Sequence, residues 1–318
     1  MTDVNIWNPM EEEEMKFINR TDEEGYFVDV PINPIDFNEY NPDKINVWDT
    51  YRSIGDEVER VTRAIKTAKF PYLIESEKGQ GKTLLIHTIC KENKIPLIEE
   101  PVGVGTKKSD LLGSKEINRD GTLFNLGLLP RAIEVANHYG HACLFCDDAS
   151  AQEHDIQRWW NRICDGRKSI VANGKQFKLK NNAKLSIVWA INPATYAGIN
   201  TLTEDLRSRF IGRAWNYPTP TEFEKVIDWD GISHDLVKEP LLTLVQDVYA
   251  LRVKGDVDYA LSVRDVAQFC DQFRYNIEDE VESPLETTLK EVIMIKFSDA
   301  SERELVKVRI NDTFGVSL

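Results

Sequence analysis

Hydrophobic positions in this chain follow two different patterns, which meet near Pro218. Between residues 50 and 217, short continuous apolar runs at 71–74, 142–146 and 185–191 alternate with stretches of helical spacing. Continuous runs of this length are typical of strands buried on both faces, as in a parallel sheet covered by helices. Strands that alternate with helices predict a three-layer α/β (αβα) core over residues 46–217.

Beyond Pro218 the pattern indicates helices only, so residues 218–318 are expected to form a small helical lid and a C-terminal tail. Helices are predicted at 235–253, at 262–275 with Ser262 as N-cap and Asp265 three residues on, and from Ser283-Pro284 with Glu286 in the capping-box position. The last residues, 304–318, are expected to form a short strand and a tail.

The remaining elements of the first unit are predicted as helices at 50–69, 128–138 and 150–164, a strand at 95–98 and a loop at 109–113. Asp120-Gly121 and Asn173-Gly174 favour two-residue turns, so a hairpin is expected around each. Residues 1–45 carry few periodic apolar positions and several turn signals. They are predicted to form an extended arm, wrapped on the body of the protein or on a neighbour.

A glycine-rich segment, Glu75-Ser76-Glu77-Lys78-Gly79-Gln80-Gly81-Lys82-Thr83, separates the apolar run at 71–74 from a helical stretch that begins with Leu84. A strand, a glycine-rich turn and a helix in this order build a phosphate cradle, because backbone N–H groups and the positive end of the helix dipole point at one anionic site. Lys82 is predicted to reach the β- and γ-phosphates of a nucleotide, and the Thr83 hydroxyl to hold Mg²⁺.

Two later strands end in polar side chains. Asp147 and Asp148 follow the run at 142–146, and Asn192 follows the run at 185–191. The carboxyl ends of parallel strands face the ligand crevice, which places these groups near the phosphate loop. Asp147 is predicted to hold Mg²⁺, Asp148 to deprotonate the attacking water, and Asn192 to fix that water or the γ-phosphate. The alternatives are two solvated turn residues and a simple Asx turn before Pro193.

Three arginines could contact the transferred phosphate. Arg207 and Arg209 lie just before the helical segment, and Arg264 is the second residue of the helix that follows Ser262. A guanidinium group is a rigid fork of donors, suited to the charge that builds on a phosphoryl group in transit. Each arginine, taken alone, is equally typical of an ordinary surface residue.

Taken in order, the phosphate loop, the Asp-Asp and Asn strand ends, Arg-x-Arg-Phe at 207–210 and Ser-x-Arg at 262–264 resemble the AAA+ ATPases. The resemblance is greatest to the MoxR group and its CbbQ/NorQ relatives in the dynein-like branch, and it covers residues 50–300. It implies Walker A at Lys82 and Thr83, Walker B at Asp147 and Asp148, sensor 1 at Asn192, an arginine finger at Arg209 (with Arg207 as a nearby alternative) and sensor 2 at Arg264.

The same resemblance implies the ligands and partners. ATP and Mg²⁺ would be bound, with the nucleotide held by Ile54, Gly55, Glu77, Lys78, Gly79, Gln80, Gly81, Lys82, Thr83, Leu84 and Arg264. Because the finger of such proteins acts on a nucleotide held by a neighbour, a homo-oligomeric ring is implied, with a hexamer as the expected size. The two hairpins would face its pore. The work would be the remodelling or activation of a protein client, reached in relatives through a partner with a von Willebrand factor A domain.

Two positions depart from the family pattern. Ser76 stands where the first glycine of the phosphate loop is expected, and Asp148 stands where the family usually has glutamate. Misplacing a catalytic group by an ångström can reduce a rate by about 10²-fold. Hydrolysis is therefore expected to be slow, and an ATP-gated assembly scaffold with little hydrolysis is an alternative function.

Composition narrows the possible partners. The net charge of −14 argues against broad attraction to nucleic acid, which needs clustered lysine and arginine. The hairpins are nevertheless locally basic, with Lys115 and Arg119 in the first and Lys168, Lys175, Lys178 and Lys180 in the second. A nucleic-acid motor or restriction-type NTPase is therefore a second alternative; a solvated edge strand would explain the lysines equally well.

Neither the N-terminus nor any apolar run indicates a membrane or an export signal. The first 15 residues are acidic, and no apolar run approaches the roughly 18 residues that cross a bilayer. A cytoplasmic protein with no membrane partner is expected. Cys143 and Cys146 form a C-x-x-C within one strand pattern, where they point to opposite faces, so they are predicted to be apolar core residues rather than metal ligands.

Overall fold

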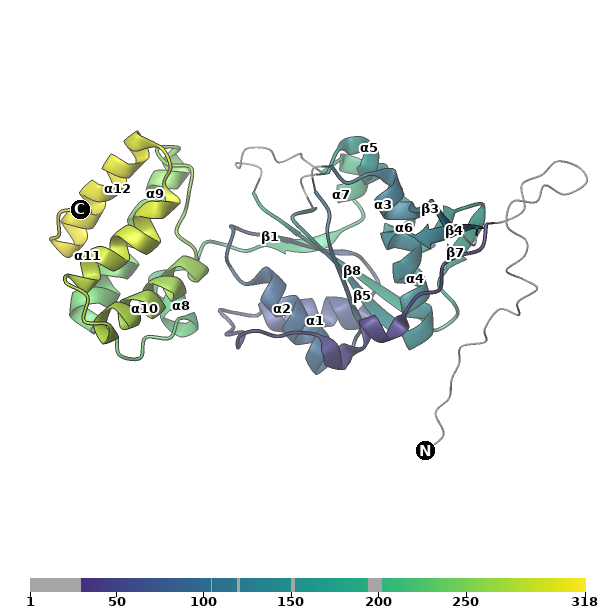
Figure 1. The fold of residues 1–318 in the computed structure, drawn as a ribbon, viewed down its shortest axis with the longest axis horizontal. Coiled ribbons are helices and arrows are strands. Elements are labelled where there is room, and N and C mark those ends of the chain that lie inside the picture. The colour runs from purple at the N-terminus through teal and green to yellow at the C-terminus, as the bar shows by residue number, and fades with distance from the viewer. Residues whose placement is uncertain (1–29, 104, 119–120, 150–151, 194–201) are drawn as a thin grey trace, which may run out of the picture.

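A five-stranded parallel sheet lies at the centre of the larger part of the molecule (Figure 1). The computed structural model describes residues 30–103, 105–118, 121–149, 152–193 and 202–318. The strand order is β2-β5-β8-β1-β9, made of β1 (Tyr72–Glu75), β2 (Leu97–Pro101), β5 (His141–Asp147), β8 (Lys184–Ile191) and β9 (Ile211–Ala214). Because β5, β8 and β1 are neighbours, the three predicted motif segments that follow them begin side by side at one edge of the sheet.

Strand β9 was not predicted from the sequence. It has only four residues, all of them exposed, so it lacks the apolar run that marks the other strands. Gly212 lets this edge strand approach β1, since a Cβ at that position would lie 2.1 Å from the Leu73 carbonyl oxygen. Strand β2 begins two residues later than predicted, at Leu97.

Helices cover both faces of the sheet and confirm the predicted three-layer core. Helices α1 (Glu57–Thr67) and α2 (Lys82–Glu92) pack on one face, and α4 (Leu128–Tyr139) packs on the other. Cys143 belongs to the apolar cluster on the face covered by α1 and α2, and Cys146 belongs to the cluster on the face covered by α4. Both side chains are fully buried. The two thiols therefore lie on opposite faces of β5 and serve as apolar core residues, as predicted.

Three predicted elements of this unit were wrong in detail. The helix predicted at 50–69 begins only at Glu57, because the Glu57 carboxylate accepts hydrogen bonds from the backbone N–H groups of Ile54 and Gly55 and holds them in a turn. The loop predicted at 109–113 contains a short helix, α3 (Lys108–Leu112). The described part of 150–164 is broken into α5 (His154–Gln157), a 3₁₀ turn (Arg158–Trp160) and α6 (Asn161–Cys164).

The break at 150–164 has a local cause. The side chain of Gln157 donates to the carbonyl oxygen of Gln152 at 3.1 Å, and the Trp160 indole donates to the Gln152 side chain at 2.9 Å. Both glutamines are fully buried. These side-chain bonds compete with the regular helical backbone pattern and hold the segment in short turns.

Both predicted hairpins are present, at the end of the molecule away from the C-terminal helices (Figure 1). They are β3 (Gly113–Asn118) with β4 (Gly121–Leu126), and β6 (Ser169–Ala172) with β7 (Lys175–Lys178). Gly121, predicted in the first turn, instead pairs with Asn118 as the first residue of β4, and Asp120 lies outside the described residues. Lys168 was expected to be a basic residue of the second hairpin, but it is buried, and its ammonium donates to the carbonyl oxygens of Ala68 and Leu185. It supports the core and is not available to a ligand at the surface.

The C-terminal part is entirely helical and has its own apolar core, from Tyr217 to Ile310. Its helices are α8 (Pro220–Val226), α9 (Glu239–Lys254), α10 (Val263–Glu278), α11 (Pro284–Thr288) and α12 (Ala300–Phe314), with π turns at His234–Lys238 and Leu289–Ile293 and a 3₁₀ turn at Met294–Lys296. The short helix α7 (Glu204–Arg207) belongs to the αβα part, where Leu206 lies in the apolar core. Ser262 caps α10 in a capping box with Asp265, as predicted.

Two predictions in this part were wrong. Residues predicted as a strand and tail form most of α12, which begins after an Asp299 cap and buries Val306 and Ile310 at helical spacing. Val308, between these two buried residues, is exposed. Helix α11 begins after Ser283, but this residue has φ 55° and its side chain makes no capping hydrogen bond.

The described part of the N-terminal arm lies on the body of the protein. Ile32 forms a parallel bridge with Phe124 of β4, and two 3₁₀ turns follow at Phe37–Tyr40 and Pro42–Lys44. The Tyr139 hydroxyl then donates to the Phe37 carbonyl oxygen at 2.8 Å. Residues 1–29, the first part of the predicted arm, lie outside the described residues. In the described ranges, no helix has the length and apolar character needed to traverse a bilayer.

Candidate nucleotide-binding site

The glycine-rich segment forms a tight loop between β1 and α2. Gly79 and Gly81 have φ of 70° and 78°, in the left-handed region that glycine adopts without strain. A Cβ at Gly79 would lie 2.3 Å from the Ser262 hydroxyl oxygen, so this glycine is also required for contact with the C-terminal helices. Helix α2 begins at Lys82 directly after Gly81, with its first N–H groups at the loop.

Lys82 is buried and its ammonium group is surrounded by oxygen atoms. It donates to the Ser76 carbonyl oxygen at 2.9 Å, the Ser76 hydroxyl at 3.1 Å, the Glu77 carbonyl oxygen at 3.1 Å and the Asn192 side-chain oxygen at 3.3 Å. Burial lowers the pKa of Lys82 to about 8, against the opposing effect of Asp147, Asp148 and Glu77. The geometry places a cation at the base of the loop, where phosphate oxygens would lie.

A second hydrogen bond joins the loop to the end of β5. The Thr83 hydroxyl donates to the Asp147 carboxylate at 2.8 Å. Hydroxyl and carboxylate oxygens are the ligands that Mg²⁺ prefers, and one or two of them with phosphate oxygens and water suffice to hold it. Thr83 and Asp147 therefore form a donor set that fits a magnesium ion.

Asp148 and Asn192 are also in direct contact. The Asn192 amide nitrogen donates to the Asp148 carboxylate at 2.7 Å, and the Asp148 backbone N–H donates to the Asp147 side chain at 3.0 Å. Asp148 has φ 50°, an unusual value for a residue other than glycine. Asn192 thus bridges Lys82 and Asp148 and brings the ends of three strands into one network.

These residues line one cavity of about 560 Å³ between the sheet and the C-terminal helices. Of the predicted site residues, Ile54, Lys78, Gly79, Gln80, Gly81, Lys82, Thr83, Leu84, Asp147, Asp148, Asn192 and Arg264 lie in its wall. Gly55 and Glu77 do not: Gly55 is in the turn held by Glu57, and Glu77 lines a second cavity. Among the described residues, the buried Gln80 side-chain nitrogen has no hydrogen-bond partner, which leaves a donor for a ligand.

Several lining residues were not predicted from the sequence. One set comes from the segment before α1, namely Trp48, Asp49, Thr50, Tyr51 and Arg52, and the other comes from the C-terminal helices, namely Val226, Ile227, Asp228, Val263, Ala267 and Asp271. The aromatic pair Trp48 and Tyr51 next to the phosphate loop was the one signal available in the sequence, since flat apolar rings suit a base. The residues of α8 and α10 carry no motif and reach the cavity only through folding.

Helix α10 contacts the phosphate loop directly. The backbone N–H of Arg264 donates to the Gly79 carbonyl oxygen at 3.3 Å. The predicted sensor arginine is thereby fixed at the cavity wall, at the N-terminal end of α10. The position of the C-terminal helices is linked to the conformation of the loop.

Arg209, the predicted finger, lies outside this cavity. Its guanidinium donates to Asp205 at 2.9 Å and to Asn161 at 3.2 Å, and its side chain is 28% exposed. Arg207 is more exposed and lies 3.6 Å from Glu75. Neither arginine is buried in the core of its own chain, and neither reaches the phosphate loop cavity of its own chain.

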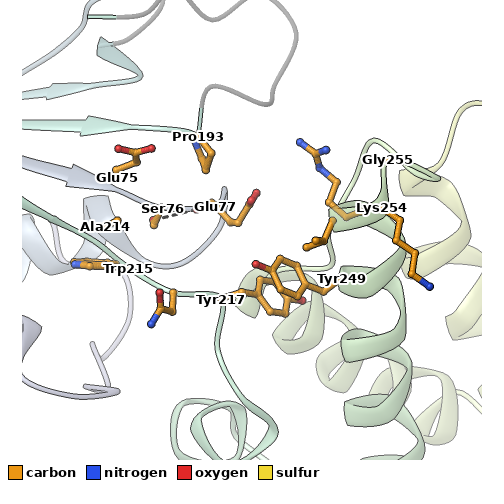
Figure 2. A pocket seen from close by; sticks show the side chains of 13 residues that line it. Glu75, Ser76, Glu77, Pro193, Ala214, Trp215, Tyr217, Tyr249, Lys254 and Gly255 are labelled. Atoms are coloured by element: carbon orange, nitrogen blue, oxygen red, sulfur yellow. Dashed lines mark hydrogen bonds between the residues drawn. The ribbon is translucent and has the colours of Figure 1, made fainter. Parts of the chain in front are cut away.

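A second cavity, of about 730 Å³, lies on the other side of the phosphate loop (Figure 2). Glu75, Ser76 and Glu77 line its sheet side, and the lid side includes Tyr217 and Tyr249, whose rings stack at 3.9 Å. This cavity lies between the end of β1 and α9 and is lined by the first residues of the phosphate loop, Ser76 and Glu77.

Curated bacterial proteins resemble this chain over more than half of its length. The chain is 23% identical over 214 residues to the denitrification regulatory protein NirQ of Pseudomonas aeruginosa. The aligned region covers 67% of this chain and 80% of NirQ. It is 23% identical over 190 residues to protein CbbQ of Hydrogenophilus thermoluteolus, covering 59% and 69%. The chain is a CbbQ/NorQ-like AAA+ protein.

Other comparisons add less. No family model matches the chain. The solved structure of a Thermotoga maritima RuvB mutant aligns with a TM-score of 0.45 and 14% identity, covering 79% of this AAA+ protein and 73% of that chain. In this AAA+ protein, the parallel sheet and the helical C-terminal part confirm the predicted fold class. The cavity that holds the phosphate loop is the candidate nucleotide-binding site.

Proposed function

We propose that this AAA+ protein hydrolyses ATP at subunit boundaries of a homo-oligomeric ring and uses the energy to remodel or activate a protein client. Each site would combine the phosphate loop of one subunit with Arg209 of the next. A hexamer is the proposed size. A partner with a von Willebrand factor A domain would deliver the client, as the family resemblance implies.

One observation carries the proposal: Lys82, Thr83, Asp147, Asp148 and Asn192 form a continuous hydrogen-bonded set in one cavity. Random surface polar groups from separate strands do not meet in this way. The set contains the three groups that phosphoryl transfer needs, which are a cation for the phosphates, oxygen ligands for a metal and a carboxylate for the water.

The roles follow from the positions of the residues. Lys82 and the N–H groups of the loop would bind the β- and γ-phosphates, and Thr83 with Asp147 would hold Mg²⁺, which neutralises phosphate charge when bound. Asp148 would accept the proton of the attacking water, and Asn192 would orient that water. Arg264 would sense the nucleotide from α10, while Trp48, Tyr51 and Ile54 would surround the base.

The partial exposure of Arg209 supports a role in a neighbouring site. Its Asp205 and Asn161 contacts use the Nε atom and one terminal nitrogen, and within the described ranges the other terminal nitrogen has no hydrogen-bond partner. Such a fixed and partly exposed guanidinium can stabilise phosphate charge across an interface.

Two observations bear on the alternative functions. The bond from Asn192 to Asp148, together with the short aspartate side chain, favours slow hydrolysis and keeps the assembly scaffold as a second candidate. Burial of Lys168 removes one of the basic residues on which a nucleic-acid motor would rely. Lys115, Lys175, Lys178 and Lys180 are exposed, and Arg119 lies outside the described residues.

The proposal is tested by measuring ATP binding and phosphate release in the Lys82→Ala variant and in wild type. Removing the ammonium should reduce ATP affinity at least about 100-fold, because the loop loses its main charge–phosphate contact. Lys66→Ala, which removes an exposed lysine at the end of α1, is the control and should behave as wild type. Equal ATP affinity in the Lys82→Ala and wild-type proteins would exclude the phosphate-loop assignment.

A further inference from the structure

Ser76 is a serine at a place where the phosphate loop pattern has glycine, and its side chain is almost fully buried, with 1% of its surface exposed. The hydroxyl donates to the Glu77 carbonyl oxygen at 3.2 Å, the bond drawn as a dashed line in Figure 2. Because its proton is used in that bond, the lone pairs of the hydroxyl oxygen are free to accept from Lys82, 3.1 Å away.

The hydroxyl gives Lys82 one acceptor more than the ammonium can use fully. The group has three N–H donors, and it lies within hydrogen-bond distance of four oxygens, two of which belong to Ser76. With glycine at position 76, three oxygens would match three donors. The hydroxyl therefore shares one of the three donors with another of these oxygens, and this shared bond stabilises the observed position of Lys82.

A nucleotide must take at least one donor away from this set. Lys82 can contact phosphate oxygens only if it releases one or more of its four protein partners. Any interaction that stabilises the free site and is lost on binding reduces affinity by the corresponding factor. Since carbonyl oxygens are fixed by the backbone, the side-chain hydroxyl is the partner most readily given up.

We propose that Ser76 is a positioning residue that holds Lys82 in its nucleotide-free place and thereby weakens the binding of nucleoside di- and triphosphates. This inference rests on the proposed nucleotide site. A ligand gains affinity from Lys82 only if it has phosphate oxygens at the β position or beyond, because these must replace the Ser76 hydroxyl as acceptors. A ligand that ends at the α-phosphate does not contact Lys82, so its affinity does not depend on the Ser76 hydroxyl.

The experiment compares ATP, ADP and AMP binding, by calorimetry and by competition, in wild type, Ser76→Ala and Ser76→Gly. We expect ATP and ADP to bind about twofold to fivefold more tightly in both variants, less than the factor for a whole hydrogen bond because the hydroxyl shares its donor, with AMP affinity unchanged. Ser76→Ala and Ser76→Gly differ in backbone freedom but both lack the hydroxyl, so equal effects in the two variants assign the change to the hydroxyl. Ser109→Ala, an exposed serine outside the cavity, is the control.

The outcomes separate this inference from the proposed function. If wild type binds ATP but both variants bind it equally or more weakly, the hydroxyl is not a tether and the inference is wrong, while the nucleotide site stands. A gain that extends to AMP, or that occurs only in Ser76→Gly, indicates a change in loop flexibility and also overturns it. If wild type binds none of the three nucleotides, the proposed function fails and the inference fails with it.

Discussion

At the scale of single residues, Asp148 and His87 are the side chains whose chemistry depends most on their surroundings. Asp148 stands where the resembling family usually has glutamate, and a hydrogen bond from Asn192 fixes its shorter carboxylate. His87 lies on α2 between two acceptors, the Asn46 carbonyl oxygen at 2.8 Å and the Glu99 carboxylate at 2.7 Å. Asp148 bears on the rate of ATP hydrolysis, and His87 bears on the stability of the fold.

Replacement of Asp148 should separate binding from hydrolysis. In Asp148→Asn we expect ATP affinity within about threefold of wild type, because phosphate contacts remain, and a loss of turnover of about 10²-fold or more because the base is gone. Asp148→Glu should raise turnover, since the longer side chain reaches further toward the water. Single-turnover phosphate release and ATP titration measure both. An unchanged rate in Asp148→Asn would remove this residue from the role of base.

His87 predicts a stability that depends on pH. Burial lowers its pKa, but the Glu99 carboxylate and the Asn46 carbonyl oxygen outweigh burial, and the pKa is raised above its usual 6.5. A raised pKa in the folded state means that the stabilisation is fully present below pH 6.5 and is lost as pH rises through the folded-state value. The Glu99 side chain is 34% exposed, so the ion pair contributes only about 1 kcal/mol.

Urea unfolding of wild type and His87→Gln at pH 6 and pH 8.5 tests this expectation. Glutamine keeps a polar side chain but carries no charge at either pH. Wild type should exceed the variant by more at pH 6 than at pH 8.5. A difference in unfolding free energy that is equal at the two pH values would show that His87 is not charged in the folded protein.

At the scale of elements, the contact between α10 and the phosphate loop links the C-terminal helices to the nucleotide. Gly79 accepts a hydrogen bond from the Arg264 backbone and has no room for a Cβ beside Ser262. The capping box that starts α10 uses the same serine. Ser262 therefore both caps α10 and packs against Gly79 of the phosphate loop, so a change in either the helix or the loop affects the other.

Gly79→Ala should displace α10 from the loop. The left-handed φ of 70° destabilises alanine by about 1 kcal/mol, and the clash with Ser262 adds to that, so ATP affinity should fall more than tenfold. Gly231→Ala is a matched control, because Gly231 has φ 71° with nothing within 4 Å of its added Cβ. It should lose a similar backbone term and keep its ATP affinity.

The double variant Gly79→Ala with Ser262→Gly isolates the clash. Removing the Ser262 side chain makes room for the new methyl group, so we expect part of the lost affinity to return. The two changes should then be non-additive in a double-mutant cycle. Purely additive effects would mean that strain in the loop itself, and not contact with α10, weakens binding.

At the scale of the whole molecule, the question is whether one chain makes a complete site. Arg209 lies outside the cavity of its own chain and keeps part of its guanidinium exposed. The proposed ring makes that arrangement useful, because each subunit completes the site of its neighbour. The test is therefore complementation between subunits.

Arg209→Ala and Asp148→Asn proteins should each be inactive alone and active when mixed. A site is complete where an Arg209→Ala subunit meets an Asp148→Asn neighbour, and random 1:1 mixing creates that pair at about a quarter of the interfaces of a ring. A mixture of Lys82→Ala with Asp148→Asn cannot form a complete site and is the control. No recovery in rings shown by native mass spectrometry to be mixed would rule out a finger in trans.

The sequence by itself determined the αβα core, both hairpins, the helical C-terminal part and the set of polar residues at the strand ends. These features follow from local patterns: continuous apolar runs, Asn-Gly and Asp-Gly turns, and a glycine-rich segment between a strand and a helix. The same patterns failed where local preference was weak, as in four-residue β9, which was not predicted, and in α12, whose residues were predicted as a strand and a tail.

Only the tertiary structure decided which residues share the cavity and which do not. Sheet order brings β1, β5 and β8 together and so joins Lys82 to Asn192, 110 positions later in the chain. Packing buries Lys168 against two carbonyl oxygens, excludes Gly55 from the cavity wall and adds Trp48, Tyr51 and residues of α8 and α10. The physical reason is that burial and hydrogen-bond partners are properties of the packed chain, whereas sequence patterns report only on neighbours a few residues apart.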